Sequence, residues 1–358
     1  MQQHKIIEQE KYIRRCIQLA MMGKESASPN PPVGAVIVHK GVILGEGYHL
    51  SKGNPHAEVN AIASVKEDSL LFDSTLYVSL EPCSHYGSTP PCAELIIKKG
   101  IPRVVVGCID PSSKVQGKGI ALLRKAGVEV QVGVLEKECQ WLIREFILSN
   151  QKRRPYVYLK WAESQDGFLD RKRSDGRAEV LSTELTNLYV HQRRSFSDAI
   201  LVGRNTALLD NPTLTTRGWE GKNSIRIVLD RNLQLPSSLH LFTDGGTTWV
   251  VTEKKMADRE KYISLSFDST FWSSLLEELY LRGVQRLLVE GGAYTHATLL
   301  SSEYWDEADV EISKKKLGQG VTAPCFTQFS KRIYYTLFGE QFVKYYRWVD
   351  DDLLTKSI

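Results

Sequence analysis

The chain has 358 residues, which is enough for two domains with separate cores at about 100 to 200 residues per domain. Hydrophobic residues make up 42% of it and charged residues 25%, as in ordinary soluble globular proteins, and a net charge of +4 is too small to indicate nucleic-acid binding by itself. No run of about 18 apolar residues occurs, and the segment after Met1 has no apolar core of signal-peptide length, so neither a membrane span nor export is expected.

The first elements of the chain are predicted from periodicity. Apolar residues recur at helical spacing over Ile6–Met22, which predicts a helix that ends at a glycine. The loop 26–32 is rich in Ser, Pro and Asn, and it holds Asn30 between two prolines. Residues 33–39 and 42–47 are expected to form two strands of a hairpin around a Lys-Gly turn.

The stretch 54–92 carries the clearest chemical signal. His56 and Glu58 lie near the start of a predicted helix, and Cys83 and Cys92 each follow a proline. A catalytic zinc site needs three protein ligands, an open position for water and a nearby carboxylate that is not a ligand. We therefore predict a Zn²⁺ site with His56, Cys83 and Cys92 as ligands. Bound zinc lowers the pKa of its water from about 15.7 toward about 7, and Glu58 can carry protons to the substrate and the leaving ammonia.

Two simpler interpretations of these residues remain open. The cysteines and the histidine could be buried core residues, or they could form a structural zinc site with His85 as a fourth ligand. The joint pattern of His-x-Glu followed by two Pro-Cys pairs is much more specific than any one of these residues, and it favours a zinc deaminase. The eight residues between Cys83 and Cys92 exceed the two that separate the cysteines of the general deaminase signature.

The remainder of the first half alternates strands with helices. Alternation of this kind predicts an α/β sandwich with a largely parallel sheet. The expected elements are a strand at 75–80, a helix that presents Cys92 in its first turn, a strand at 104–106, a helix at 119–126, a strand at 128–134 and a helix at 136–149. A charged segment at 151–155 ends in proline and marks the predicted boundary between residues 1–150 and 155–358.

The second half also reads as an α/β domain. We expect strands at 156–161, 199–202, 225–229, 248–252 and 286–290, a helix at 183–194, and an aromatic-rich edge hairpin at 331–348. The strand that ends at Glu290 runs into Gly291-Gly292 and a helix, a junction at which backbone N–H groups can bind a phosphate. No G-x-G-x-x-G follows a strand, so the dinucleotide-binding fingerprint is missing.

These motifs resemble the bifunctional riboflavin-biosynthesis deaminase–reductases, and the resemblance covers nearly the whole chain. In the first half it rests on Ser28-Pro29-Asn30-Pro31, 33–38, Gly47-Tyr48-His49, Pro55-His56-Ala57-Glu58 and 81–92. In the second half it rests on Leu159-Lys160, Ser164, Asp166-Gly167, 198–203, Thr206, Leu209-Asp210, 212–215, Arg217 and 288–292.

The resemblance implies a fold and a function. The fold would be a cytidine-deaminase-like α/β/α sandwich followed by a dihydrofolate-reductase-like α/β domain. The first domain would deaminate 2,5-diamino-6-(5-phosphoribosylamino)pyrimidin-4-one with zinc, and the second would reduce the ribosyl group to ribityl with NADPH. The partner would be this small phosphorylated pyrimidine, and neither nucleic acid nor a membrane is expected.

The resemblance also implies roles for individual residues. Asn30 and His49 would contact the substrate in the deaminase pocket. In the second domain, the ribose phosphate and the pyrimidine would be held by Lys160, Arg194, Leu214, Arg217 and Glu290. NADPH would be bound by Thr206, Asp210, Gly292, Ala293, Tyr294, Thr295, His296, Ala297 and Thr298.

The chain departs from the family pattern at three places. Ser88 stands where the cysteine loop usually has a basic or amide residue, so a phosphate contact would be lost. The segment Ala178–Ser182 replaces a usual Ser-x-Trp-Ile-Ser/Thr, and Glu163 stands where a small or apolar residue is usual. The nicotinamide pocket would accordingly be altered.

Two other functions share part of this pattern. One is a zinc deaminase that acts on tRNA through an RNA-binding second domain, and the other is a deaminase whose second domain serves only for binding or dimerisation. The long cysteine spacing and the resemblance of the second half favour the two-step enzyme. The cysteines outside the zinc site are expected to be reduced thiols in a cytoplasmic protein, and a homo-oligomer is compatible with the sequence.

Overall fold

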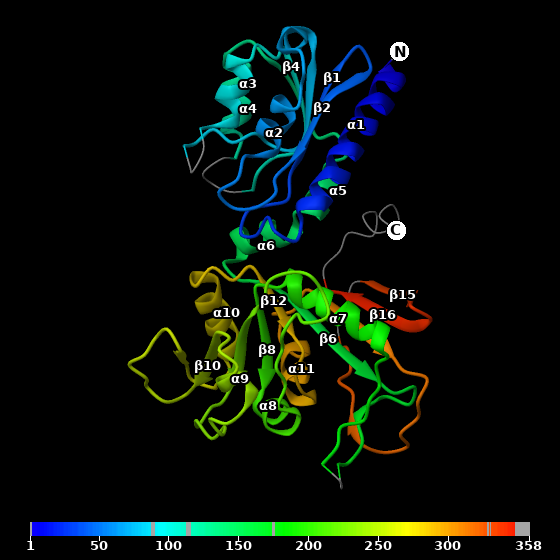
Figure 1. The fold of residues 1–358 in the computed structure, drawn as a ribbon, viewed down its shortest axis with the longest axis vertical. Helices are drawn as coiled ribbons and strands as arrows, with labels where there is room; N and C mark the ends of the chain where they lie inside the picture. Colours follow the sequence, from blue (N-terminus) through cyan, green and yellow to red (C-terminus); the bar gives the residue numbers. More distant parts are fainter. Residues whose placement is uncertain are drawn as a thin grey trace. The chain divides into compact units, whose positions relative to one another are not determined.

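The computed structural model describes residues 2–86, 90–111, 116–173, 176–327, 329 and 331–347, with side chains from residue 7 onward. The chain divides between Arg153 and Arg154 into two compact units (Figure 1). Within the described ranges, no helix has the length and apolar character needed to cross a membrane.

The first unit is built on a five-stranded sheet in the order β2-β1-β3-β4-β5. Its strands are β1 (Gly34–His39), β2 (Val42–Tyr48), β3 (Thr75–Leu80), β4 (Arg103–Cys108) and β5 (Glu129–Val132). Strand β1 is antiparallel to both β2 and β3, whereas β3, β4 and β5 are parallel. The expectation of a largely parallel sheet was therefore wrong for half of the pairings. The two-residue turn at Lys40-Gly41 can join only antiparallel strands, while each parallel pair has a crossover helix.

Helices cover both faces of this sheet. Helices α1 (Gln2–Gly23) and α5 (Glu136–Leu142) pack on one face, where Ile13 and Cys139 share a core with alternate residues of β1, β3 and β4. Helices α2 (Ala57–Ala63), α3 (Cys92–Lys98) and α4 (Lys118–Lys125) pack on the other face around the intervening strand residues, and a 3₁₀ helix, η1 (Asp68–Asp73), leads into β3. The predicted α/β/α sandwich is confirmed.

The helix predicted at 136–149 is broken. Helix α5 ends at Leu142, and α6 (Arg144–Lys152) begins two residues later. Ile143 between them has φ −104° and ψ 18°, which lies outside the helical region and interrupts the hydrogen-bond ladder. The apolar periodicity continues through this break, so the sequence pattern alone does not reveal it.

The second unit contains a nine-stranded sheet in the order β11-β10-β9-β8-β12-β6-β13-β16-β15. Seven strands are parallel, namely β6 (Tyr156–Glu163), β8 (Ala199–Gly203), β9 (Ile225–Leu229), β10 (Thr248–Thr252), β11 (Tyr262–Ser264), β12 (Arg286–Val289) and β13 (Glu307–Ile312). The antiparallel hairpin of β15 (Lys331–Leu337) and β16 (Glu340–Tyr346) closes one edge, as predicted from its aromatic alternation. Trp348, at the end of the predicted hairpin, lies outside the described residues.

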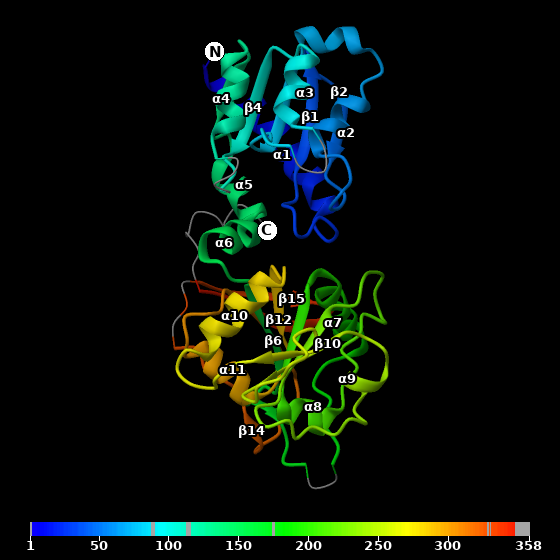
Figure 2. The same cartoon turned by 90° about the vertical axis from the view of Figure 1, so that its left-hand side faces the viewer.

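Helices again lie on both sides of this sheet. Figure 2 shows α7 (Glu184–Phe196) on one side of β6 and β12, with α10 (Phe271–Leu281) and α11 (Ala293–Leu300) on the other. The main core forms under α10 and α11, where Leu275 and Leu299 pack against Val157 and Leu201. The remaining elements are α8 (Arg204–Asp210), α9 (His240–Thr243) and a two-stranded ribbon of β7 (Phe168–Asp170) and β14 (Val321–Thr322). The predicted order of two α/β domains is confirmed.

Candidate active sites

Three metal-ligating side chains converge in the first unit. His56 precedes α2, Cys83 lies in the loop after β3, and Cys92 is the first residue of α3. Their ligand atoms lie within 4.8 Å of one another, and His56 Nδ1 is 3.3 Å from Cys92 Sγ and 3.5 Å from Cys83 Sγ. Within the described ranges this is the sole group of its kind, and the exposed His85 is outside it. Three ligands with no fourth side chain suit a catalytic zinc better than a structural one.

The cluster favours an anionic Cys83. The backbone N–H of Cys92 donates to Cys83 Sγ at 3.3 Å, as expected at the start of a helix, where N–H groups are free. Hydrogen bonds from the Cys92 thiol and from His56 outweigh burial and hold the pKa of Cys83 well below its usual value. Zinc binds the thiolate, so a low pKa means that little free energy is spent on deprotonating this ligand.

Glu58 lies beside the cluster and is not one of its three ligand residues. It sits in the first turn of α2 and is only 4% exposed. Burial, followed by the charge of Cys83, raises the pKa of Glu58 to about 7. A bound dication would act in the opposite direction. With the ion bound, the pKa of Glu58 would lie below this value, so the side chain would start as a carboxylate that can accept a proton, as a general base must.

Asn30 and His49 form a hydrogen bond next to the cluster. Asn30 Nδ2 is 3.0 Å from His49 Nε2, and His49 Nδ1 is 3.2 Å from the carbonyl oxygen of Pro55. Because the carbonyl can only accept, Nδ1 carries the proton and Nε2 accepts from the amide of Asn30. Burial lowers the pKa of His49, which agrees with a neutral ring. The His49 and His56 rings meet edge to face at 5.3 Å, so both predicted substrate contacts lie at the predicted zinc site.

Glu81 organises the cysteine loop, a role that sequence reasoning missed. Its buried carboxylate accepts hydrogen bonds from the backbone N–H groups of Gly117 at 2.9 Å, Gly119 at 3.0 Å, and Asp110 and Ile120 at 3.3 Å. These contacts tie the residue two positions before Cys83 to the start of α4. The available signal was a carboxylate directly after a strand in which four of the six residues are apolar or aromatic.

A second cluster of predicted site residues lies in the second unit. Arg194 on α7 binds Glu290, at the end of β12, through Nε–Oε1 at 2.8 Å and Nη2–Oε2 at 2.7 Å. Arg194 Nη1 also donates to the carbonyl oxygen of Thr215 at 3.1 Å. Burial raises the pKa of Glu290, but the charges and hydrogen bonds of Arg194, with Lys160 behind them, outweigh it and lower the pKa overall. Glu290 is therefore ionised at neutral pH.

Lys160 is held near this pair by Glu311, which sequence reasoning also missed. Lys160 Nζ lies 3.8 Å from Glu311 Oε2, and the Glu311 carboxylate accepts from Ser182 Oγ at 2.6 Å and from Thr186 Oγ1 at 2.8 Å. The signal was present in Glu307–Ile312, where acidic residues alternate with Ala, Val and Ile. In a strand, that alternation places three carboxylates on one face.

The positions that depart from the family pattern have defined environments. Ser182 donates to Glu311, Val180 is exposed, and Glu163 accepts from Trp161 Nε1 at 2.9 Å. Burial raises the pKa of Glu163. Ser88 lies outside the described residues.

The predicted cofactor residues approach each other where two strands end. Gly292 has φ +77°, and a Cβ there would stand 3.0 Å from Thr206 Oγ1. A Cβ on Gly203 would stand 2.6 Å from Thr295 Oγ1. The Thr206 and Thr295 side chains therefore leave little room for a Cβ at these two glycines. The ends of β8 and β12 themselves approach so closely that a Cβ on Gly291 would stand 2.6 Å from the Val202 Cα. Helix α11 begins directly after Gly292, and its first N–H groups have no partner within the helix. Such a junction fits a phosphate of a nucleotide cofactor.

Not every residue of the predicted cofactor set points to this place. Asp210 forms an ion pair with Arg173 at 2.5 Å. The His296 side chain is buried against Trp161, with ring centroids 4.9 Å apart, so His296 can reach a cofactor only through its backbone. The other members of α11 range from the exposed Tyr294 and Ala297 to the half-buried Ala293 and Thr298.

The residues predicted to bind the substrate do not all lie together. Leu214 is buried with φ +53°, while Arg217 is exposed and donates to Thr213 Oγ1 at 2.9 Å. Lys160, Arg194 and Glu290 form a compact group, and Arg217 stays on the loop beside it.

Comparisons with known proteins match both halves of the chain. Residues 6–108 match the cytidine and deoxycytidylate deaminase zinc-binding region, and residues 155–337 match the RibD C-terminal domain. Riboflavin biosynthesis protein RibD of Aquifex aeolicus is 38% identical over 87% of this chain and 88% of its own, and that of Bacillus amyloliquefaciens is 38% identical over 88% and 87%. A solved deaminase–reductase from Thermotoga maritima is 37% identical, with a TM-score of 0.85 over 96% of this chain and 100% of its own.

Proposed function

Because the chain belongs to the RibD family, and is thus a deaminase and a reductase of riboflavin biosynthesis in one polypeptide, we propose which of its residues perform each step. Residues 1–150 form the deaminase domain and residues 155–358 the reductase domain. The observation that carries the proposal is the convergence of His56, Cys83 and Cys92 beside the buried Glu58.

His56, Cys83 and Cys92 hold a zinc ion in the first domain. Zinc bound by three protein ligands supplies a water whose pKa is lowered to about 7. Glu58 would take one proton from that water and deliver it to the ring nitrogen next to the carbon to which the hydroxide oxygen bonds. Glu58 would then take the second proton, from the new hydroxyl group, and pass it to the amino group, so that the carbon–nitrogen bond breaks, a carbonyl remains and ammonia leaves.

Asn30 and His49 orient the pyrimidine. The neutral His49 accepts one amide proton of Asn30, which fixes the orientation of the amide. The Asn30 carbonyl oxygen and its second amide proton are then left to pair with the edge of the ring. A rigid amide of this kind distinguishes a donor from an acceptor on the substrate.

In the second domain, NADPH is held by the segment Gly292–Thr298 together with Thr206 and Asp210. NADPH supplies the hydride that converts the ribosyl group to ribityl, and the protein supplies orientation and phosphate binding. The two-point ion pair fixes the positions of Glu290 and Arg194, which hold the substrate. Arg217 keeps guanidinium donors beyond those used by Thr213 and Thr215, and it holds the ribose phosphate. Lys160 adds positive charge, and Leu214 contacts the pyrimidine.

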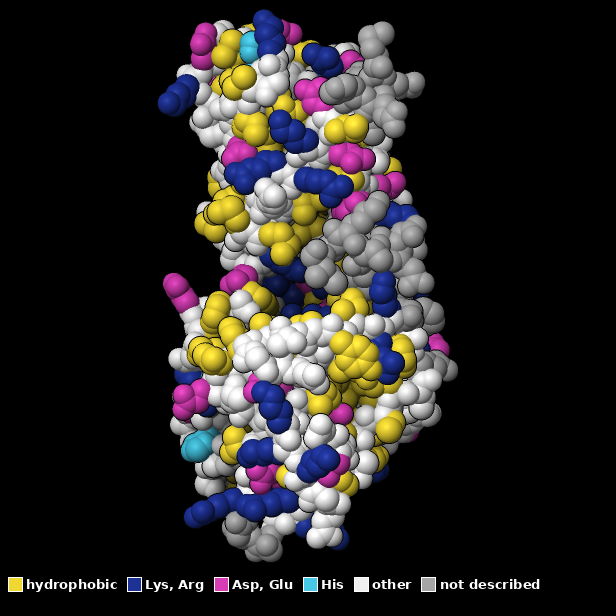
Figure 3. Space-filling model, turned by 90° about the vertical axis from the view of Figure 1, so that its right-hand side faces the viewer, with side chains coloured by type: hydrophobic (Ala, Val, Ile, Leu, Met, Phe, Trp, Pro, Cys, Tyr) yellow, Lys and Arg dark blue, Asp and Glu magenta, His cyan; other side chains and the backbone are white. Residues whose placement is uncertain are grey.

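The rival functions are not favoured. The relatives match this chain through both halves, and the second half matches a RibD domain rather than an RNA-binding domain. In Figure 3, lysine and arginine side chains on the drawn face are interspersed with acidic ones rather than gathered in one basic patch. A second domain used only for binding or dimerisation is likewise not favoured. The cytoplasmic location and a homo-oligomeric state stay predictions.

The proposal is tested by following two signals separately. Purified zinc-loaded protein is given 2,5-diamino-6-(5-phosphoribosylamino)pyrimidin-4-one and NADPH, and ammonia release and NADPH oxidation are recorded. We expect both, with NADPH oxidation starting after a lag because the deaminated product must form first. Removal of zinc with a chelator should stop ammonia release but leave reduction of the supplied deaminated intermediate intact.

Two outcomes would contradict the assignment. Ammonia release without oxidation of NADPH, even with the intermediate supplied, would mean that the second domain has lost its chemistry. Release that persists after zinc removal would separate the reaction from the His56 cluster. Replacing NADPH with NADH serves as the cofactor control.

A further inference from the structure

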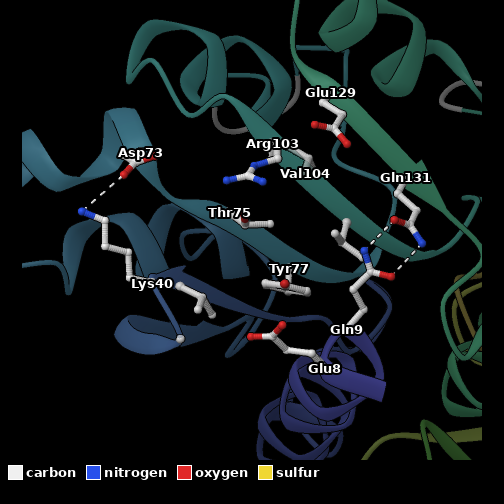
Figure 4. A pocket seen from close by; sticks show the side chains of 13 residues that line it. Glu8, Gln9, Lys40, Asp73, Thr75, Tyr77, Arg103, Val104, Glu129 and Gln131 are labelled. Carbon is white, nitrogen blue, oxygen red and sulfur yellow. Dashed lines mark hydrogen bonds and ion pairs between the residues drawn. The ribbon is translucent and has the colours of Figure 1, made fainter. Parts of the chain in front are cut away.

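The first unit contains a cavity that neither reaction uses. It has a volume of about 190 Å³ and lies under the start of α1, at the end of the sheet where β3, β4 and β5 begin (Figure 4). The zinc-binding residues follow the opposite end of β3. Six residues of strand at about 3.3 Å each place the two sites roughly 20 Å apart. The cavity also lies on the α1 face of the sheet, whereas His56 and Cys92 belong to the helices of the other face.

Tyr77 forms the floor of this cavity. The residue is 7% exposed, and its ring packs against Tyr12 with centroids 4.8 Å apart. Among the described residues, no partner is found for its hydroxyl group, which opens into the cavity. Burial raises the pKa of Tyr77 to about 12, so the hydroxyl keeps its proton and can donate. The hydroxyl is thus a donor that is open to the cavity and is not used by a described protein group.

Charges of opposite sign stand on the two sides of Tyr77. Figure 4 shows the Arg103 guanidinium on one side and the Glu8 carboxylate on the other. Neither has an ion-pair or hydrogen-bond partner for its side chain within the described part of the chain, although both act electrostatically on Tyr77. Glu129 is paired in register with Arg103 on the neighbouring strand and adds a second carboxylate to the wall.

The other walls are closed by internal contacts. Gln9 and Gln131 exchange two amide hydrogen bonds, of 2.6 and 2.8 Å, which fasten α1 to β5. Lys40 and Asp73 pair at 3.8 Å on the opposite side. Arg103, Glu8, Glu129 and the Tyr77 hydroxyl have no such contact within the described part of the chain and remain to meet a ligand.

We propose that this cavity binds a small zwitterion, with its carboxylate on Arg103 and its protonated amine on Glu8, across Tyr77 from Arg103. Tyr77 donates to the carboxylate from below. A cavity of about 150 Å³ can enclose a benzene molecule, so 190 Å³ admits a short amino acid but no nucleotide. The site is separate from the deaminase and reductase centres, and its occupancy does not depend on either assignment.

Other ligand classes fit less well. A metal ion needs converging ligands, and within the described ranges the cavity carboxylates do not form a group close enough to hold one. A polyphosphate is disfavoured because three carboxylates, those of Glu8, Asp73 and Glu129, face only two cationic side chains. A molecule with one charge of each sign can pair with both Arg103 and Glu8.

The test is calorimetric titration of the full-length zinc-loaded protein with ω-amino acids from glycine to 6-aminohexanoate. Butyrate and butylamine are the single-charge controls. We expect one chain length to bind saturably and at least tenfold more tightly than either control. The substitutions Arg103→Gln and Glu8→Gln should each weaken that binding at least tenfold, and Tyr77→Phe should weaken it several-fold.

Matched substitutions outside the cavity give the control. Glu10→Gln lies one residue beyond Gln9 on the same helix, and Arg124→Gln lies on α4; both should leave binding within twofold. The deaminase rate should be unchanged in all five variants, which reports that the unit is folded. The absence of saturable binding by every member of the series, or binding that survives both Arg103→Gln and Glu8→Gln, would overturn the proposal.

Discussion

Arg194 and Glu290 are 96 positions apart in the chain, yet their side chains form a two-point ion pair of 2.8 and 2.7 Å. Both are nearly buried, with side-chain exposures of 12% and 10%. Removing one partner of a buried pair leaves an uncompensated charge, which costs about 3–5 kcal/mol. The pair therefore fixes α7 against the end of β12 and holds a carboxylate in the proposed reductase site.

We expect Glu290→Gln to lower NADPH oxidation with the deaminated intermediate at least tenfold and to leave ammonia release within twofold. The second unit should also unfold at a lower urea concentration. Glu253→Gln is the matched control, because Glu253 binds Arg231 in the same two-point manner on the surface, where solvent screens the pair and its loss has little effect. Equal effects of the two substitutions on NADPH oxidation would remove Glu290 from the site.

The role of Glu58 is tested by Glu58→Gln, which keeps the shape of the side chain but cannot carry a proton. Loss of a general acid–base group typically costs a factor of about 10²–10⁴ in rate. Ammonia release should fall by that factor, while the zinc content and NADPH oxidation with supplied intermediate stay unchanged. Glu94→Gln, in the first turn of α3, is the control and should retain the rate. A Glu58→Gln variant with full activity would refute the assigned role.

Much of the fold was predictable because the relevant signals are local. Strands such as 75–80 and 225–229 were predicted to the residue, since short apolar runs between turn residues leave little choice of boundary. The same holds for the zinc cluster, because His56, Cys83 and Cys92 each stand at the edge of a predicted element. The strands bring these edges together, so the three residues of the sequence motif lie close to one another in the fold.

What could not be predicted depends on contacts between distant segments. Glu81 and Glu311 are held by partners 36 and 125 positions away, and no local pattern in the sequence identifies those partners. His296 illustrates a different limit. It belongs to a segment expected to contact cofactor, but its position on α11 turns the side chain into the core, and only packing decides that direction.

Glu81 should control how firmly zinc is held. Its carboxylate accepts four backbone N–H groups, and buried donors that lose their partner cost about 1–3 kcal/mol each. We expect Glu81→Ala to lower the free energy of unfolding of the first unit by at least about 3 kcal/mol and to speed zinc loss to a chelator several-fold. Glu81→Gln keeps one acceptor oxygen. Its free energy of unfolding and its rate of zinc loss should lie between those of Glu81→Ala and those of the parent protein. Glu67→Ala, at an exposed site, should change neither quantity; an unchanged rate of zinc loss in Glu81→Ala would contradict the prediction.

His296 should make the second unit sensitive to acid. Burial lowers the pKa of its ring to about 3 from an ordinary 6.5, and no partner for either ring nitrogen is found among the described residues. Between these two values the unfolded chain binds a proton that the folded unit excludes, so stability falls as the pH is lowered from 6.5 toward 3. At pH 5 the loss from this residue alone should be about 2 kcal/mol, since each pH unit in the window is worth about 1.4 kcal/mol.

The contribution of His296 is separated from that of the carboxylates by comparing the parent protein with His296→Leu. Urea unfolding at pH 7 and at pH 5, followed by tryptophan fluorescence, gives the free energy of unfolding for both proteins. We expect the parent protein to lose about 2 kcal/mol more than the variant between these two pH values, because only the parent gains a proton at position 296 on unfolding. Parallel losses in the two proteins would show that the ring is protonated, or reached by water, in the folded unit.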